Sequence, residues 1–307
     1  MADITASMVK DLREKTGAGM MDCKKALSET GGDLEAAVDW LRAKGIAKAA
    51  RKASRVAAEG LIGLAVEGRK AALVEVNSET DFVARNPDFQ AMVNAIAAAA
   101  LKTGGDVEKL RDTASQGSRQ RIADKLAEMV ATIGENMTLR RTAVLSVEQG
   151  VIGSYLHNQI APGLGKIGVL VAVESTAGAD KLASLARQLA MHIAASNPVA
   201  LDLGGVAPEV LEREKAILAE KNAGKPANVL QRIFESGLKS FAKEHTLLEQ
   251  AYVHDGAKSV AQVLKEAEAQ IGAPVRLAGF VRYQLGEGIE KDAGDFAAEV
   301  AKAAQGS

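Results

Sequence analysis

One large aromatic side chain sits in a short polar run, Thr80-Asp81-Phe82-Val83, and this stretch is the best suited to contact another molecule. The run follows an apolar, β-prone segment and precedes Pro87, so we expect a surface loop. An aromatic side chain presented on a loop is typical of an anchor that inserts into a protein partner. The alternative interpretation is that Phe82 packs beneath the helix that follows, as most aromatic side chains do.

A second pattern with possible chemistry is the glycine run Gly163-Leu-Gly165-Lys-Ile-Gly168. Its spacing matches a dinucleotide-binding motif, which requires a strand before the glycines and a helix directly after them. Here the glycines precede an apolar strand at 169–173, and the next helix is expected only near Asp180. We therefore interpret the run as a turn, and a dinucleotide-using enzyme remains an alternative class of protein.

The histidines offer no metal site, because none of them has a partner at the spacing that metal ligands require. We expect His192 to be structural, since it lies beside the core face of its helix, and His157 to be exposed near the end of a strand. Cys23 is the only cysteine, which excludes an internal disulfide and a multi-cysteine metal site. With no nucleophile motif and no paired carboxylates, we predict a protein that is not an enzyme and uses no cofactor.

Composition limits the partners that such a protein would have. The 307 residues carry a net charge of −1, which provides no general attraction for nucleic acid or an anionic membrane. Aromatic residues make up 3% of the chain, too few to favour base stacking along single strands. The chain opens without a secretory signal and lacks a membrane-length apolar run, so we expect a cytoplasmic protein.

The segment 44–55 is the one local exception, since it holds five bases and no acid. We interpret it as a solvated helical extension, and a phosphate-binding arm of an RNA-associated scaffold remains the second alternative. Before it, the pattern predicts two short helices and a third that Asp33 caps. After it, apolar runs at 61–66 and 71–76 predict a β-hairpin, followed by two amphipathic helices and a strand at 137–147.

The strand-and-helix pattern that follows the basic segment occurs twice in the sequence. AALVEVNS at 71–78 aligns with GVLVAVES at 168–175, and LAEMVATIGENMTL at 126–139 aligns with LKEAEAQIGAPVRL at 264–277. The offset grows from 97 to 138, so the second copy should carry an insertion of about 41 residues, where two helical stretches predict a hairpin. We predict an α+β fold with the following parts: a helical domain at 1–55, core halves at 56–148 and 149–284, an inserted helical hairpin at about 205–247, and a C-terminal module at 285–307 with an amphipathic stretch of Phe296, Ala297 and Val300.

The repeat also bears on Phe82. At the offset of 97, Thr80, Asp81 and Phe82 align with Ala177, Gly178 and Ala179. If the second copy forms the same corner without a large side chain, the fold does not require Phe82 there. This comparison favours a role in binding over a role in the core.

At these residues the chain resembles the bacterial elongation factor Ts family. The matching stretches are LREKTGAGMMDCKKAL at 12–27, EVNSETDFVARN at 75–86, ATIGENMTLRR at 131–141, AMHIAAS at 190–196 and GEGIEKDAGDFAAEVA at 286–301. They follow the family's order over nearly the whole chain. The resemblance implies a UBA-like N-terminal domain, a duplicated core with antiparallel sheets, an inserted helical hairpin and a C-terminal module.

The resemblance further implies that the protein promotes the exchange of guanine nucleotides on elongation factor Tu. In the family, the factor binds the GDP form of this GTPase, and the loop that corresponds to Thr80, Asp81, Phe82 and Val83 is implicated in displacing the partner's Mg²⁺. Other expected partner contacts, by the same resemblance, are Arg13, Met20, Met21, Ile133, Gly134 and His157. The loop at 157–168 is longer than is usual in the family.

Overall fold

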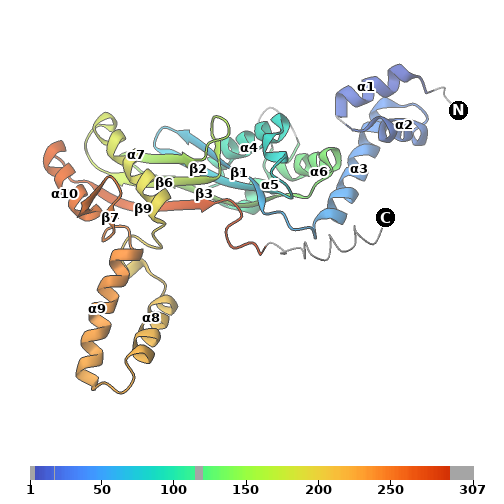
Figure 1. Cartoon of the computed structure of the whole chain (residues 1–307). Helices are drawn as coiled ribbons and strands as arrows, with labels where there is room; N and C mark the ends of the chain where they lie inside the picture. The colour runs from blue at the N-terminus through green and yellow to red at the C-terminus, as the bar shows by residue number, and fades with distance from the viewer. Residues whose placement is uncertain (1–3, 17, 115–119, 291–307) are drawn as a thin grey trace.

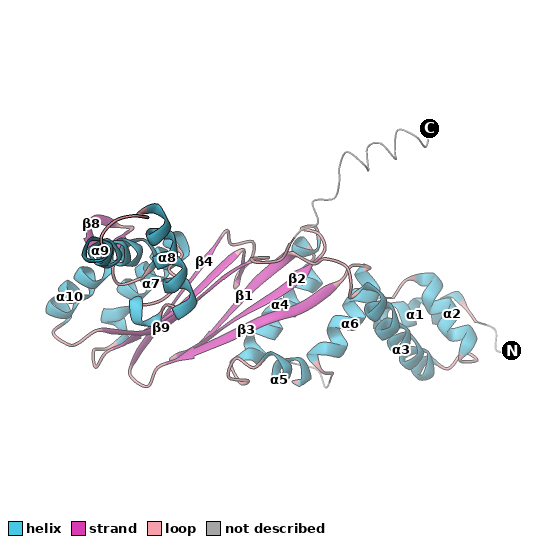
Figure 2. Cartoon of the chain, turned by 90° about the horizontal axis from the view of Figure 1, so that it is seen from below, coloured by secondary structure: helices cyan, strands magenta, loops and turns pink. Residues whose placement is uncertain are grey.

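The computed structural model describes residues 4–16, 18–114 and 120–290, and it has the α+β architecture with antiparallel sheets that the sequence predicts (Figures 1 and 2). The expected amphipathic stretch with Phe296, Ala297 and Val300 lies outside the described residues. No helix among the described residues is long and apolar enough to cross a membrane.

Three helices form a small module at one end of the molecule (Figure 1). They are α1 (Ala6–Thr16), α2 (Met20–Glu29) and α3 (Leu34–Lys52). Apolar side chains from all three, including Leu12, Leu27 and Ala37, make its core. The predicted cap of α3 is confirmed, because the Asp33 carboxylate accepts hydrogen bonds from the amides of Glu35 and Ala36. The basic segment is helical as far as the end of α3.

The first antiparallel sheet has the strand order β3-β2-β1-β5. Its strands are β1 (Glu59–Glu67), β2 (Lys70–Ser78), β3 (Met137–Ser146) and the short β5 (Leu164–Gly165). β1 and β2 form the predicted hairpin. Helices α4 (Pro87–Ala100), α5 (Val107–Asp112) and α6 (Ile122–Ile133) contribute to the core on one face of this sheet; α5 was not predicted from the sequence.

The second antiparallel sheet has the order β4-β6-β9. Its strands are β4 (Gly150–His157), β6 (Ile167–Glu174) and β9 (Arg276–Gln284), and α7 (Ala179–Ser196) and α10 (Val260–Ile271) pack against it. A short hairpin, β7 (Ala251–Tyr252) and β8 (Asp255–Ser259), lies beside this core and was also not predicted. Between the sheets, apolar side chains such as Leu73 and Leu170 form a third core. The order is therefore helices, sheet, sheet, helices.

The two sheets share irregularities at equivalent positions. The register of β2 against β3 shifts between Glu75 and Val76, and that of β6 against β9 shifts between Ala172 and Val173, the positions expected from the offset of 97. Gly60 and Gly150 both have φ near +117°, at 119° and 115°, and a Cβ atom at either would approach a strand carbonyl oxygen within 2.2 or 2.0 Å. Only glycine fits such positions, so both copies need it for the same reason.

The insertion in the second copy is a helical hairpin that projects from the core (Figure 1). It contains a 3-10 turn, η2 (Leu203–Gly205), and the helices α8 (Pro208–Lys221) and α9 (Ala227–His245). At its base, Ala200 and Thr246 form a parallel β-bridge. Leu247, at the end of the expected insertion, is fully buried in the second core, so the projecting part ends before it.

One expectation about the repeat is wrong. The second copy does not form the same corner as the loop with Phe82, because α7 begins at Ala179, the position equivalent to Phe82. In the first copy the corresponding helix, α4, begins five residues later, at Pro87. A residue before proline disfavours the helical conformation, and Asn86 is extended, with φ −71° and ψ 125°. The proline therefore delays the start of the helix, and the residues before it form a loop with one 3-10 turn.

Candidate functional site

The candidate site is the loop between β2 and α4, which exists because α4 begins only at Pro87. It contains Glu79, Thr80 and Asp81 and a short 3-10 helix, η1 (Val83–Arg85), and ends at Asn86. The Asn86 side chain accepts hydrogen bonds from the amides of Asp88 and Phe89, at 2.8 and 3.1 Å, and so caps α4. The loop therefore ends at a fixed helix terminus.

Phe82 is 74% exposed, in the middle of this loop. The interpretation in which Phe82 packs beneath the helix is therefore wrong, and Phe89 takes that place, with no exposed surface. The next residue, Val83, is 4% exposed and packs into the first core. The backbone is thus held from below while the aromatic ring faces outward.

Thr80 fixes the other side of the loop through all of its polar groups. Its amide and its hydroxyl donate to the two carboxylate oxygens of Glu135, at 2.9 and 2.7 Å, and its carbonyl accepts from the Ser78 hydroxyl at 2.9 Å. Glu135 lies in the connection between α6 and β3. Asp81 and Phe82 are left as the exposed residues between two anchored neighbours, and the Asp81 carboxylate lies 3.8 Å from the Arg85 guanidinium.

The neighbouring Glu79 and Asn136 also contact each other, with the loop residue now as the hydrogen-bond acceptor. The Glu79 carboxylate accepts from the Asn136 amide and lies 3.5 Å from the guanidinium of Arg55, just after α3. The Asn136 side chain donates to the carbonyl of Arg55 at 2.7 Å. The end of the N-terminal module is therefore attached to the same loop.

The remaining predicted contacts lie in three places. Arg13, Met20 and Met21 are exposed in the N-terminal module, the methionines by 57% and 77% of their surface. Ile133 is half-buried against the first core, so only part of its side chain is accessible. Gly134 has a left-handed backbone, φ 89°, that ends α6, and its carbonyl accepts from Lys52. It turns the chain so that Glu135 can reach the loop.

The predictions for two histidines are confirmed. His157 is exposed at the end of β4, within 3.2 Å of the Tyr155 hydroxyl. His192 is fully buried, and burial lowers the pKa of its imidazole. Its ring contacts the Gln250 side chain at 3.1 Å and accepts from the amide of Val253 at 3.2 Å, which fixes α7 against the β7–β8 hairpin.

The glycine run also has the predicted structure. Gly163 makes a left-handed turn, Leu164 and Gly165 form β5, and Gly168 lies within β6. No helix follows these glycines directly, so they do not form the phosphate cradle of a dinucleotide fold. Instead, β5 pairs with β1 of the first sheet, so the loop at 157–168 helps to join the two halves.

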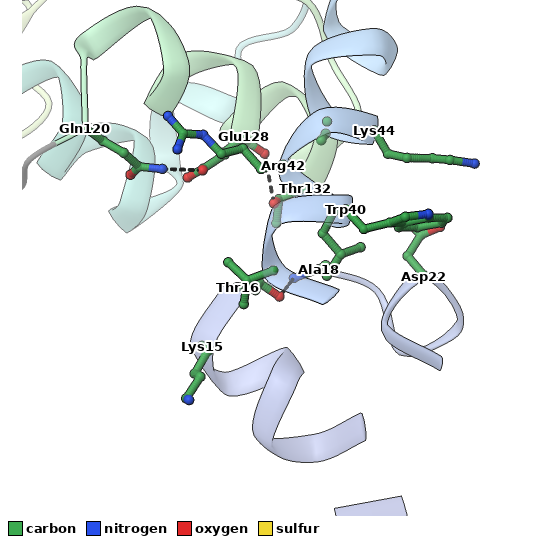
Figure 3. A pocket seen from close by; sticks show the side chains of 14 residues that line it. Lys15, Thr16, Ala18, Asp22, Trp40, Arg42, Lys44, Gln120, Glu128 and Thr132 are labelled. Atoms are coloured by element: carbon green, nitrogen blue, oxygen red, sulfur yellow. Dashed lines mark hydrogen bonds between the residues drawn. The ribbon is translucent and has the colours of Figure 1, made fainter. Parts of the chain in front are cut away.

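A cavity of about 210 Å³ lies where the N-terminal module meets α6 (Figure 3). Several of its charged and polar side chains have close partners: Arg42 pairs with Asp124, outside the lining, at 3.0 Å, Gln120 donates to Glu128, and Lys44 lies 4.5 Å from the centre of the Trp40 ring. Among the described residues, no cluster of three or more side chains could hold a metal ion. We interpret the cavity as a joint between modules.

Sequence reasoning missed Glu79, Glu135 and Asn136 as parts of the site. The last two lie in the stretch ATIGENMTLRR that carried the resemblance, but 55 residues separate Glu135 from its partner Thr80. Neither periodicity nor local spacing reports a contact over that distance. Their polar side chains beside a glycine helix end were the available signal.

Comparison with known proteins defines the class as a translation elongation factor. The family model described as "Elongation factor TS" matches residues 79–287. The chain is 65% identical over 307 residues to elongation factor Ts of Methylobacterium sp. (strain 4-46), with all of both chains covered. It is 64% identical to that of Xanthobacter autotrophicus and 61% identical to that of Azorhizobium caulinodans, in each case over 304 residues and 99% of both chains. The chain belongs to the elongation factor Ts family.

Proposed function

We propose that this protein is the guanine nucleotide exchange factor for elongation factor Tu, and that Asp81 and Phe82 promote GDP release by displacing the partner's Mg²⁺. The exposure of Phe82 on a loop anchored at both sides is the observation that carries this proposal. An outward aromatic side chain costs the free protein nothing in lost core packing and gains its burial only in a complex.

Mg²⁺ is sensitive to such a displacement because it requires nearly ideal octahedral coordination at about 2.0–2.1 Å. A loop that moves one of the groups around the ion therefore weakens both metal and nucleotide binding. The carboxylate of Asp81 is about half exposed and makes a long contact, 3.8 Å, with Arg85, so it is available beside the inserted ring. The protein itself needs no cofactor and catalyses no covalent step in this proposal.

The energy of one phenylalanine is not sufficient. Burying Phe82 contributes about 1.5–3 kcal/mol, whereas a ten-thousandfold faster GDP release requires about 5.5 kcal/mol, at about 1.36 kcal/mol per factor of ten. The rest must come from a wider interface. Arg13, Met20, Met21 and His157 are exposed and can contribute side-chain contacts, and Ile133 and Gly134 are the other contacts that belong to this proposal.

Coupling between the two ligands of the GTPase is reciprocal. A factor that weakens GDP binding must itself bind less tightly when GDP is present, by the same factor. The proposal thus predicts that GDP dissociates the complex. A cytoplasmic location, without direct membrane or nucleic-acid binding, belongs to the same proposal.

The test is Phe82→Ala, assayed by the release of a fluorescent GDP from elongation factor Tu. We expect release to slow about ten- to a hundredfold, the equivalent of losing the buried ring. Thermal melting of the free factor should be nearly unchanged, because the ring is exposed. Val253→Ala is the matched control, since Val253 is a half-exposed apolar residue in the β7–β8 turn. Normal exchange by the Phe82 variant would overturn the proposal.

A further inference from the structure

Glu135, in the connection between α6 and β3, contacts Thr80 in the loop between β2 and α4. Its two carboxylate oxygens accept both the amide and the hydroxyl of Thr80. The residue before Thr80, Glu79, in turn accepts from the amide of Asn136. Two adjacent residues of the loop are thus hydrogen-bonded to two adjacent residues of the α6–β3 connection. We call Glu79, Thr80, Glu135 and Asn136 the loop clamp.

The second copy of the core is an internal control for the loop clamp. Its α10–β9 connection has the same geometry, because Gly272 ends α10 with φ 77° just as Gly134 ends α6 with φ 89°. The residues equivalent to the clamp are Thr176, Ala177, Ala273 and Pro274. Neither alanine nor proline can make these contacts, since Ala273 has no carboxylate and Pro274 has no amide hydrogen.

The second copy therefore connects its strand to its helix without a clamp, and its helix begins at the position equivalent to Phe82. The copy that has the clamp is the copy in which Pro87 breaks the helix and releases Phe82 into the loop. In the second copy the amide of Ala177, equivalent to Thr80, donates to the nearby Ser175 hydroxyl at 3.1 Å, whereas the amide and hydroxyl of Thr80 both donate to the distant Glu135. A binding loop that is already ordered loses less entropy when it docks.

We propose that Glu135 is a positioning residue for nucleotide exchange, which holds Thr80 so that Asp81 and Phe82 are presented in the geometry that the partner binds. The inference rests on the proposed function of the loop. It also concerns the free protein, because the two hydrogen bonds exist without a partner. That second consequence allows the two proposals to fail separately.

The first experiment uses Glu135→Ala in the full chain and measures hydrogen exchange at the amide of Thr80. We expect exchange at this amide to become at least tenfold faster, because its acceptor is removed. The melting temperature should change little, since the second copy lacks the contact. Glu135→Gln keeps one carbonyl acceptor and should restore part of the protection. Unchanged protection of the Thr80 amide in Glu135→Ala would overturn the inference, whatever the effect on nucleotide exchange.

The second experiment measures the release of fluorescent GDP from elongation factor Tu at a subsaturating concentration of factor. Glu135→Ala should lower the rate about tenfold and Glu135→Gln less. The control is Glu268→Ala, which removes a carboxylate that accepts from the amide of Val275, at 2.9 Å, in the corresponding connection of the second copy. GDP release promoted by this control variant should occur at the normal rate.

The double variant of Glu135→Ala and Phe82→Ala separates positioning from a general structural role. If Glu135 acts through the loop, it should add little to the defect of Phe82→Ala, so the two effects are not additive. Fully additive effects would overturn the inference while leaving the proposed function intact. Normal exchange by Phe82→Ala alone would instead overturn the proposed function, and the amide measurement would still test the clamp.

Discussion

Removing the helical hairpin should leave the core folded, and the base of the hairpin shows where to cut. Next to the bridge between Ala200 and Thr246, the amide of Leu247 donates to the Ala200 carbonyl at 2.9 Å. Deleting Leu203–Glu244 keeps these contacts. The bridge is parallel, so Asp202 and His245 leave it in opposite directions and lie about 11 Å apart, by strand spacing and rise. A linker of roughly five glycine and serine residues covers that distance.

The cost follows from the few buried side chains that the deletion removes. Val206 and Ala242 are 6% and 4% exposed, while the other residues of α8 and α9 are exposed or half-buried. Losing one buried valine and one methyl group costs about 2–4 kcal/mol. For a chain of this size the melting temperature should fall by roughly 5–15 °C. A domain with a typical unfolding free energy of about 5–15 kcal/mol stays folded after a loss of this size, so the transition should stay cooperative.

Calorimetry of the shortened chain is the assay, and Leu247→Ala in the full chain is the comparison. Leu247 is fully buried in the second core, so its truncation should cost about 2–5 kcal/mol. Truncating Leu247 at the base should then lower the free energy of unfolding at least as much as removing the whole projecting hairpin. Loss of cooperative melting in the shortened chain, with Leu247→Ala only mildly affected, would show that the hairpin is an integral part of the core.

Two further predictions concern the N-terminal module and the buried histidine. Replacing Met20 and Met21 by serine should weaken binding to elongation factor Tu at least tenfold in calorimetry, since both are largely exposed, and should leave the melting temperature unchanged; equal affinity would exclude them from the interface. Because burial lowers the pKa of His192 in the folded state, its contribution to stability is complete above the ordinary pKa of about 6.5 and is lost as the pH falls below it. Urea unfolding between pH 7.5 and 5 should therefore show a steeper loss for the native chain than for His192→Gln, by up to about 1.4 kcal/mol per pH unit; parallel slopes would refute this.

Much of the fold could be predicted because periodicity reports burial directly. The hairpin of β1 and β2, the apolar faces of α4 and α6 and the two helices of the insertion all follow from it. The buried position of His192 follows as well, since it lies on the inner side of α7. These features depend on residues that are close in the sequence.

Features that depend on distant contacts could not be predicted in this way. Glu75 is fully buried in β2, which its charge alone would argue against, because Arg140, Arg141 and the amide of Gly286 surround its carboxylate. The pairing of β5 with β1 likewise joins segments about a hundred residues apart. The candidate site shows both cases: Phe82 was visible in the sequence, whereas its support by Glu135 was not.

The break at Pro87 shows why comparison of the two copies is more informative than either copy alone. Features that both copies share, such as Gly60 and Gly150 or the strand irregularities, are those that the duplicated sheets require. Features that only one copy has are not needed to form the sheet and its helices. In the first copy these are the proline, the exposed Phe82 and the partner of Thr80, and all three meet at one corner. Because the scaffold forms without them, the needs of folding alone do not explain why they coincide, whereas the proposed role in partner binding would.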